Sequence, residues 1–289
     1  MEVSGKTKVC AVIGDPIEHS LSPLIHNAAF KHLKLDFLYV AFRVKKEELR
    51  GAVQGARSLN IHGLNVTMPH KTAIIKYLDE IDSTAKNIGS VNTVLNVDGK
   101  LVGFSTDGVG ALNALKNNQI EPKGRKLLLL GAGGAAKAIA FQLAPEVKEL
   151  KIINRTGGKA KKLAKFLQEK FDKKIAGETL SPSLLEEWLR DVDILINATS
   201  VGMHPNSDQT LVKREWLKST LAVMDIVYDP LETRLIKDAK AAGAKVVYGT
   251  EMLIFQAAAS FEIWCGCPAP VDIMRETVLK NLQKTEVVK

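Results

Sequence analysis

A lysine at the end of the stretch "GLNVTMPHK", which runs from Gly63 to Lys71, is the first candidate for chemistry in this chain. It follows an apolar run and a proline, so we expect it at the carboxyl end of a strand, where open α/β sheets bind their ligands. A lysine there can hold an anion, or it can carry a proton to and from a reacting carbonyl oxygen. The bland alternative is a solvated surface lysine at the start of a helix.

Polar residues in two other segments have both a structural and a chemical interpretation. Thr106 or Asp107, in "STDGVG", caps the helix that follows, or Asp107 serves as a carboxylate in the site. Ser20 and Ser22 lie in "HSLSPLIHNAA", where we expect Ser22 as the helix N-cap and Pro23 at the first helical position. The same geometry presents hydroxyl groups to a substrate carboxylate at a helix N-terminus, so capping and anion binding are compatible.

A glycine fingerprint, "GAGGAA" at residues 131–136, directly follows the apolar run "KLLLL" and opens a helical pattern. In this G-x-G-x-x-A pattern Gly131 allows the tight turn, Gly133 the close approach of a ligand, and Ala136 the packing of helix on strand. The free N–H groups of such a helix start suit a pyrophosphate. The segment therefore predicts dinucleotide binding, with a ligand-free glycine turn as the alternative.

The end of the next expected strand indicates which dinucleotide is bound. A cofactor with a free ribose 2′-hydroxyl usually meets an Asp or Glu at this position, but here the strand ends in "INRT". Arg155 offers a planar, permanently charged group that suits a 2′-phosphate and stacks on adenine, and Lys159 follows on the next helix. We therefore predict NADP(H) rather than NAD(H); a surface arginine in a basic protein is the alternative.

Composition limits the class of protein. The 289 residues, 46% hydrophobic and 25% charged, are those of a soluble globular protein with one large domain or two medium ones. The net charge of +8 comes from scattered lysines with no basic tail or aromatic-interleaved stripe, so we expect no nucleic-acid partner. The apolar stretch "LLLLGAGGAAKAIAFQLA" contains a lysine and a glycine-rich junction, and we expect strand, turn and helix there rather than a membrane span.

Cysteine and histidine usage is equally informative. Cys10, Cys265 and Cys267 do not form a disulfide framework, a redox pair or half of a zinc ribbon. We expect reduced thiols and, since the N-terminus lacks the apolar core of a secretory signal, a cytoplasmic protein. The six histidines show no metal-ligand grouping, and no metal is expected.

Short β-rich runs alternate with helical patterns along the whole chain, which is typical of the α/β class. Up to residue 106 the expected strands are 8–13, 37–44, 62–67 and 91–97, the last joined to 101–105 by an Asp98-Gly99 hairpin, and the expected helices are 23–33, 46–57 and 71–78. From about residue 107 the expected strands are 126–131, 149–154, 193–199, 221–227 and 244–249, with helices at 134–144, 157–171, 231–242, 250–265 and 271–284.

Nine segments taken together resemble the shikimate dehydrogenase family over the whole chain. In order they are "GDPIEHSLSPLIHN", "GLNVTMPHK", "IGSVNTV", "FSTDGVG", "LLLGAGGAAKA", "INRT", "INATSVGM", "DIVYDPLETRL" and "YGTEMLIFQAA". The resemblance implies NADPH-dependent reduction of 3-dehydroshikimate to shikimate in aromatic amino acid biosynthesis. It also implies two α/β domains: an N-terminal substrate domain with a mostly parallel sheet, residues 1–106 plus 250–289, and a Rossmann-type NADP-binding domain, residues 107–249. C-terminal helices return to the first domain, and the active site is expected in the cleft between the two.

The same resemblance implies roles for individual residues. Lys71 matches the catalytic lysine, which donates a proton to the carbonyl oxygen or stabilises its negative charge, and Asp107 matches its partner. Ser20 and Ser22 match the carboxylate-binding hydroxyls. The other substrate-contacting positions match Asn65, Thr67, Asn92, Tyr228 and Gln256. The cofactor-binding positions match Gly131, Ala132, Gly133, Gly134, Ala135, Asn154, Arg155, Thr156, Thr199, Val201, Met203, Gly249 and Met252. Lys159 stands where the family commonly has arginine, which implies a weaker second contact to the 2′-phosphate.

Two alternatives to this function stay open. One is a quinate/shikimate dehydrogenase with a broader substrate range or NAD use. The other is a nucleotide-sensing regulator that keeps the fold without catalysis. In either case the expected partners are small molecules, with no nucleic acid and no membrane, and a homodimer is left open.

Overall fold

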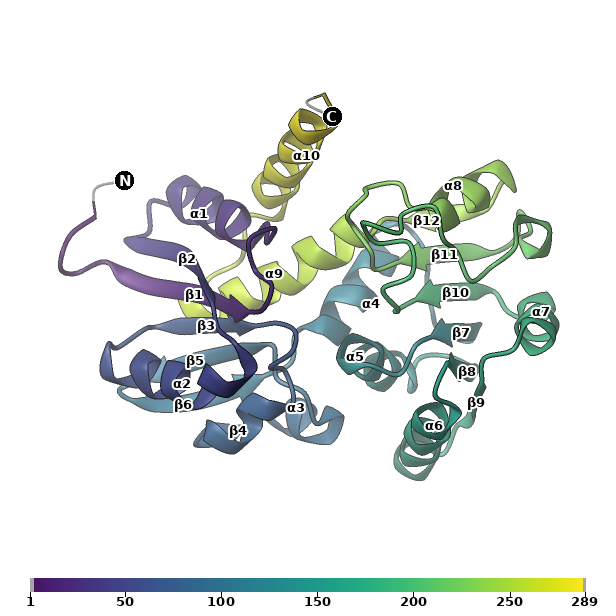
Figure 1. The fold of residues 1–289 in the computed structure, drawn as a ribbon, viewed down its shortest axis with the longest axis horizontal. Helices are drawn as coiled ribbons and strands as arrows, with labels where there is room; N and C mark the ends of the chain where they lie inside the picture. Colours follow the sequence, from purple (N-terminus) through teal and green to yellow (C-terminus); the bar gives the residue numbers. More distant parts are fainter. Residues whose placement is uncertain (1–2, 288–289) are drawn as a thin grey trace. The chain divides into compact units, whose positions relative to one another are not determined.

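The computed structural model describes residues 3–287, with side chains described as far as Leu282. The chain divides into two compact units, each built around its own sheet (Figure 1). The first comprises the described residues up to Thr106 and those from Ile254 onward, and the second runs from Asp107 to Leu253. The predicted α/β class is confirmed.

The first sheet has six strands in the order β2-β1-β3-β5-β6-β4. Strands β2, β1 and β3 are parallel, β5 and β6 form an antiparallel hairpin beside β3, and β4 is parallel to β6. Asp98 and Gly99, both with positive φ, make the predicted hairpin turn. The strands are β1 (Lys8–Gly14), β2 (Phe37–Arg43), β3 (Gly63–Val66), β4 (Glu80–Ile81), β5 (Thr93–Val97) and β6 (Lys100–Phe104).

Helices cover the first sheet because their apolar residues repeat with helical spacing. In α2 (Leu49–Ser58) the buried side chains Leu49, Val53 and Ala56 form one stripe, which packs on the sheet. The other helical elements of this unit are α1 (Ser22–His32), η1 (Lys46–Glu48), η2 (Ala73–Tyr77), α3 (Ser83–Ile88), α10 (Val271–Val287) and most of α9 (Gly249–Cys265).

Helix α9 supplies the aromatic part of the first core. Phe261 packs against Phe30 of α1 at 5.3 Å between ring centroids, and the indole N–H of Trp264 donates to the carbonyl of Val94 on β5 at 2.9 Å. A side chain added at Gly63 on β3 would come within 2.4 Å of the Trp264 indole, so this strand needs glycine to admit the ring. A helix from the end of the chain is therefore built into the sheet from its beginning.

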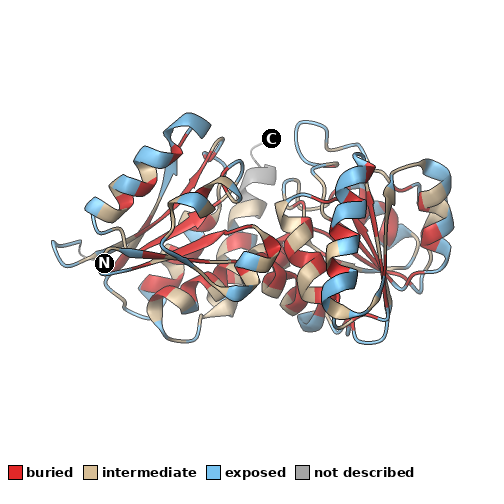
Figure 2. Cartoon of the chain, turned by 90° about the horizontal axis from the view of Figure 1, so that it is seen from below, coloured by how far each residue is buried: buried red, intermediate tan, exposed pale blue. Residues whose placement is uncertain are grey.

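The second sheet is fully parallel, in the order β12-β11-β10-β7-β8-β9. Read from β9 this is the strand order 3-2-1-4-5-6 of a doubly wound dinucleotide-binding fold, with the change of direction between β7 and β10. Central strands are buried on both faces, as continuous apolar runs predict (Figure 2). The strands are β7 (Lys126–Leu130), β8 (Glu149–Asn154), β9 (Lys174–Thr179), β10 (Ile194–Asn197), β11 (Ala222–Asp225) and β12 (Lys245–Val247).

Crossover helices link these strands and turn their apolar stripes to the sheet. In α6 (Gly157–Phe171) the buried residues Ala160, Leu163, Ala164 and Leu167 recur at intervals of three and four. The remaining helical elements of the second unit are α4 (Asp107–Asn117), α5 (Gly134–Leu143), α7 (Pro182–Arg190), η3 (Arg214–Trp216), α8 (Arg234–Ala241) and the first turn of α9.

The structure differs from the sequence prediction at several elements. The segment 71–78 is not an α-helix: only Ala73–Tyr77 is helical, with 3₁₀ geometry. Five elements were not predicted: β4, α3, β9, α7 and η3. Helix α3 is short, capped by the Asp82 carboxylate and ended by Gly89 at φ 67°.

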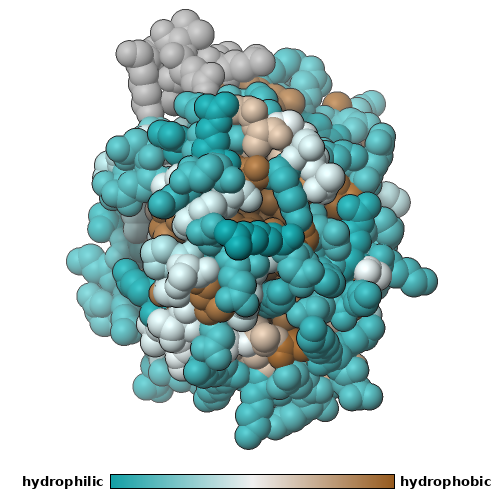
Figure 3. Space-filling view, turned by 90° about the vertical axis from the view of Figure 1, so that its right-hand side faces the viewer, coloured by the Kyte–Doolittle hydropathy of each residue, from teal (hydrophilic) through white to brown (hydrophobic). Residues whose placement is uncertain are grey.

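Figure 3 shows a largely hydrophilic face with small, separate apolar areas. This agrees with the expectation that the scattered charges behind the net charge of +8 lie on a solvated surface. Within the described part of the chain, every helix falls short of the length and apolar character needed to cross a bilayer.

Candidate active site

Lys71 lies in the loop after β3, and the backbone around it is tightly held. Its carbonyl accepts a hydrogen bond from the N–H of Val91 at 2.8 Å, and the preceding His70, fully buried, has its Nε2 2.7 Å from the carbonyl of Val44. The N–H of Thr67 donates to Ile13 of β1 at 3.0 Å. Lys71, half-buried, therefore lies in a fixed loop beyond the carboxyl end of β3, as predicted.

The neighbouring strand end is fitted to this loop. A side chain at Gly14, the last residue of β1, would come within 2.4 Å of the Thr67 methyl group and 3.1 Å of the Met68 carbonyl. The N–H of Asp15 donates to that same carbonyl at 3.0 Å. Gly14 thus lets the two loops of the first unit close on one another.

A cluster of buried polar side chains lies beside the loop that carries Lys71. The side chain of Asn92 donates to Thr106 Oγ1 at 2.8 Å, and its Oδ1 accepts the N–H of Thr106 at 2.8 Å. Thr106 Oγ1 in turn donates to the carbonyl of Gln256 at 3.0 Å, and Asn92 Nδ2 lies 3.3 Å from Gln256 Oε1. Two predicted substrate residues, Asn92 and Gln256, are thereby brought together in the first unit.

Asn65 belongs to the same cluster, but its polar atoms face other protein groups. Its Oδ1 accepts the Tyr39 hydroxyl at 2.7 Å, and its Nδ2 lies 3.1 Å from Ser260 Oγ and 3.2 Å from Thr93 Oγ1. The side chain is 7% exposed. In this structure Asn65 is hydrogen-bonded within the cluster. Its partners Tyr39, Thr93 and Ser260 are residues that the sequence did not indicate.

The prediction that Ser22 caps α1 is wrong. The helix begins at Ser22 itself, Pro23 occupies its first turn, and the residue before it, Leu21, makes no side-chain cap. Instead the hydroxyl of Ser20 accepts the N–H of Ser22 at 3.3 Å. The half-buried Ser20, which precedes the N-cap Leu21, thus accepts the first N–H of the helix, and Ser22 is 8% exposed.

Asp107 is the first residue of α4 and directly follows Thr106 of the polar cluster. Its side chain is 5% exposed. Tyr228 follows β11 in the second unit and is half-buried; burial raises the pKa of its phenol above the ordinary value, so the hydroxyl is protonated at neutral pH.

The glycine loop in the second unit has the geometry that its sequence predicts. Gly131 adopts φ 116°, and a side chain there would come within 2.7 Å of the Ala198 carbonyl. Gly133, the N-cap of α5, is exposed, with open space where a side chain would stand. The first glycine is therefore required by the protein's own packing. The second leaves room for a ligand above the helix start, which Gly134 and Ala135 form, while Ala132 is buried.

The adenosine-side residues lie between β8 and α6. Asn154 ends β8, and its Nδ2 donates to the carbonyl of Thr156 at 3.0 Å, which closes the turn. Arg155, Thr156 and Lys159 are all exposed around the N-terminus of α6. The arrangement offers cationic groups and a helix start to an anion.

The loop after β10 carries three predicted cofactor residues. Asn197 organises it: its Oδ1 accepts both the N–H (3.1 Å) and the hydroxyl (2.7 Å) of Thr199, and its Nδ2 donates to the carbonyl of Val201 at 3.3 Å. Met203, two residues on, is 42% exposed. Asn197 was not predicted to contribute.

The other two predicted cofactor residues lie at the start of α9. Gly249 is buried, and a side chain there would come within 2.4 Å of the Val227 carbonyl, so the helix start needs glycine to approach the loop after β11. Met252, one turn further, is 6% exposed.

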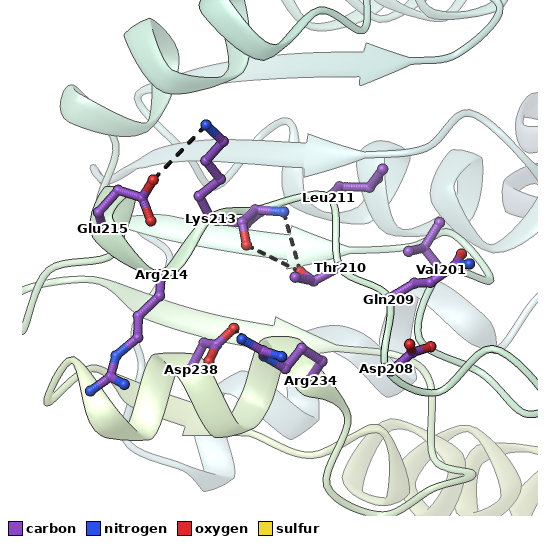
Figure 4. A pocket seen from close by; sticks show the side chains of 11 residues that line it. Val201, Asp208, Gln209, Thr210, Leu211, Lys213, Arg214, Glu215, Arg234 and Asp238 are labelled. Atoms are coloured by element: carbon purple, nitrogen blue, oxygen red, sulfur yellow. Dashed lines mark hydrogen bonds and ion pairs between the residues drawn. The ribbon is translucent and has the colours of Figure 1, made fainter.

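A cavity of about 550 Å³ lies in the second unit, between the segment 208–215 and α8 (Figure 4). Four of its charged side chains form two pairs: Lys213 Nζ lies 4.0 Å from Glu215, and Arg234 Nε lies 2.7 Å from Asp238. Val201 is the single predicted site residue in its lining. Because the glycine loop takes no part in its lining, the cavity adds no residue to the candidate site.

Comparison with known proteins bears on the whole chain. Three family models match it in succession: shikimate dehydrogenase substrate binding domain over residues 12–94, shikimate/quinate 5-dehydrogenase over 113–228, and shikimate 5′-dehydrogenase C-terminal domain over 249–279. The NADP(+) shikimate dehydrogenase of Methanopyrus kandleri is 49% identical over 286 residues, 98% of this chain and 99% of the relative. The chain belongs to the shikimate dehydrogenase family. The family predicted from the sequence is confirmed.

Solved structures agree with this assignment to the shikimate dehydrogenase family. A shikimate dehydrogenase crystallised in complex with NADP+ has a TM-score of 0.91 and 45% identity, covering 97% of this chain and 98% of that one. The Thermus thermophilus enzyme in complex with NADP(H) and shikimate has a TM-score of 0.84 and 37% identity, covering 94% and 99%.

Proposed function

We propose that this chain catalyses the reversible NADP-dependent reduction of 3-dehydroshikimate to shikimate, a step in aromatic amino acid biosynthesis. The observation that carries the proposal is the near-complete match to relatives named NADP(+) shikimate dehydrogenase, at 49% and 47% identity over 98% of the chain. The glycine loop of the second unit lies in the region that the central family model matches, and in the polar cluster of the first unit Asn65 and Asn92 lie in the first matched region and Gln256 in the third.

The cofactor is assigned to residues 107–249 and the substrate to residues 1–106 plus 250–289. The open space above Gly133 at the start of α5 suits a pyrophosphate, and the exposed Arg155 guanidinium suits the 2′-phosphate that distinguishes NADP from NAD. Thr199, Val201 and Met203 take the nicotinamide side. When bound, NADPH supplies the hydride that reaches the C3 carbonyl carbon.

Lys71 supplies the proton in this proposal. Its protonated amine donates to the carbonyl oxygen as that oxygen becomes an alcohol, and the neutral amine accepts the proton in the reverse direction. Asp107 is the partner carboxylate of Lys71 in this proposal. A positioned ammonium also stabilises negative charge that develops on the oxygen.

The substrate's other polar groups are assigned to residues of matching chemistry. The hydroxyls of Ser20 and Ser22 hold the carboxylate, and Thr67, Asn92, Tyr228 and Gln256 contact the ring hydroxyls or the carboxylate. Asn65 contributes through the polar cluster, since its own Oδ1 is occupied by Tyr39.

A quinate/shikimate dehydrogenase with broader substrate or NAD use is the second candidate, favoured by the description of the central family model, shikimate/quinate 5-dehydrogenase. Quinate bears an extra hydroxyl on the carboxylate-bearing carbon, so its acceptance depends on room beside Ser20 and Ser22. The exposed Arg155 and the lack of a carboxylate after β8 favour the NADP-linked reaction.

The test is the absorbance of NADPH formed from NADP and shikimate by the purified chain, with quinate and NAD as the other substrate and cofactor. We expect reduction with shikimate and NADP at a kcat/KM at least tenfold above every other pair. No NADPH formation with shikimate would refute the proposal, and comparable rates with quinate and NAD would transfer it to the second candidate. A homodimer and a cytoplasmic location stay predictions from the sequence, open to light scattering and cell fractionation.

A further inference from the structure

A buried carboxylate lies behind the loop that follows β10. Asp225, the last residue of β11, is 0% exposed, and three donors meet its two oxygens. Oδ1 accepts Asn197 Nδ2 at 2.9 Å and the N–H of Val227 at 3.1 Å, and Oδ2 accepts the hydroxyl of Thr233 at 2.7 Å. Strand β11 pairs directly with β10. Asp225 therefore binds three chain segments: the end of β10, the residues after β11 and the residue before α8.

The contact with Asn197 fixes which way that side-chain amide points. An ionised carboxylate has only acceptors, so the NH₂ group of Asn197 must face Asp225 and its oxygen must face away. That oxygen is the acceptor for both the N–H and the hydroxyl of Thr199, and the same NH₂ also reaches the carbonyl of Val201. Asp225 is thereby linked through Asn197 to the Thr199–Met203 loop, of which it is not a part.

The contact with Thr233 braces the same loop from its other side. The Thr233 hydroxyl donates to Asp225 and accepts the N–H of Ile236 at 3.3 Å, which caps α8. Gly202, in the middle of the loop, has φ 93°, and a side chain there would stand 3.6 Å from Thr233 Cβ. The backbone of the loop therefore passes close to the residue that Asp225 orients.

Burying the Asp225 carboxylate costs the folded state free energy. This cost argues that the residue does more than stabilise the fold. Burial raises the pKa of Asp225 to about 6 in spite of its three hydrogen bonds. The charged side chains of α8 nearest in sequence, Arg234 and Asp238, pair with one another at 2.7 Å. A neutral amide of the same shape would avoid the cost of burying the charge, and the chain nevertheless carries an acid here.

We propose that Asp225 is a positioning residue: its carboxylate holds the Thr199–Met203 loop, through Asn197 and Thr233, in the conformation that receives the nicotinamide half of the cofactor. The proposal rests on the proposed function, since it takes NADP to bind in the second unit. It assigns no contact between Asp225 and the cofactor, and it leaves the adenosine side at Arg155 independent.

The experiment compares two ligands that share only the adenosine half. Binding of NADPH is followed by its fluorescence, and adenosine 2′,5′-bisphosphate, which lacks the nicotinamide, is titrated as its competitor, on wild type, Asp225→Asn, Thr233→Val and Thr233→Ser. We expect Asp225→Asn and Thr233→Val to raise the Kd for NADPH about tenfold, as for one lost hydrogen bond to a charged group. The Kd for adenosine 2′,5′-bisphosphate should stay within about twofold. Thr233→Ser keeps the hydroxyl and is the matched control, with both constants near wild type.

Each other outcome overturns the inference. An equal loss of affinity for both ligands would show general damage to the unit, and unchanged NADPH binding would show that the loop needs no support from Asp225. If Asp225→Asn does not fold, the Thr233→Val and Thr233→Ser pair decides alone. Wild type that binds neither ligand would refute the proposed function and this inference with it, whereas tight wild-type binding with unaffected variants refutes the inference alone.

Discussion

His26 should make the stability of the protein depend on pH in a way that one substitution can isolate. The side chain is 0% exposed on α1, and within the described residues neither ring nitrogen has a hydrogen-bond partner. Its ring stacks on Tyr39 at 4.4 Å with 11° between the planes and lies 5.2 Å from the ring of Trp264. Burial lowers the pKa of His26 from 6.5 to about 3.

The size of the effect follows from this pKa. In the unfolded chain His26 takes up a proton below about pH 6.5, but the folded protein does not do so until about pH 3. Its contribution to stability is therefore fully present above pH 6.5 and is lost as pH falls towards 3. The slope is about 1.4 kcal/mol per pH unit, so about 2 kcal/mol is lost between pH 7.5 and pH 5.

The assay is urea unfolding at pH 7.5 and pH 5 for wild type and His26→Phe, which keeps a ring in the stack but cannot titrate. We expect wild type to lose about 2 kcal/mol more than the variant over this interval. The exposed His32, also on α1, supplies the matched control, and His32→Phe should follow wild type. If His26→Phe and wild type lose the same stability, the ring is not held neutral by burial and the reasoning fails.

Four further substitutions test other parts of the structure. Lys71→Ala should lower kcat at least ~10²-fold with a modest change in the KM for shikimate, because a proton donor acts mainly in the transition state; an unchanged kcat excludes that role. Arg155→Asp should abolish or invert the preference for NADP over NAD, and a constant ratio of the two kcat/KM values would disprove the 2′-phosphate contact. Tyr39→Phe leaves Asn65 Oδ1 without the hydroxyl now 2.7 Å away and should cost about 1–3 kcal/mol in urea unfolding; a loss below about 0.5 kcal/mol contradicts it. Asp225 has a folded pKa of about 6, above its unfolded value, so between pH 6.5 and pH 4 the stability of wild type should rise by about 2 kcal/mol relative to that of Asp225→Asn; parallel profiles would argue against a buried charge.

The parts of the fold that could be predicted are those whose burial requires a continuous run of apolar residues. Strands β7 and β10 are central, covered on both faces, and consist almost wholly of Leu and Ile. The edge strand β9 has one fully buried side chain, Ile175, and its "KIAGET" carries no such run. Helix α7 did offer a signal, because Ser181 followed by Pro182 is a typical helix start and the Ser181 hydroxyl caps it at 3.3 Å.

Some residues of the candidate site could likewise be predicted from the sequence, and others could not. The glycine loop has a fixed spacing that backbone geometry demands, so Gly131 could be recognised from the sequence alone. Asn197 and Asp225 could not, because an Asn or Asp at the end of a strand carries no local sign of its partner 28 residues away. The wrong cap at Ser22 has a related cause: Ser20 and Ser22 are both of a residue type that caps helices, but the N-cap is Leu21 between them, and residue type alone does not decide at which residue a helix begins.

Because the chain is synthesised from its N-terminus, the contacts of α9 with the first sheet can form only late in synthesis. The second unit is one uninterrupted segment, from Asp107 to Leu253, whereas the core of the first sheet must wait for Phe261 and Trp264. During synthesis the strands up to Phe104 emerge first, yet their aromatic cover arrives after the entire second unit has been made. The nucleotide-binding unit can therefore fold on the nascent chain, while the first unit cannot complete its core until α9 has been synthesised.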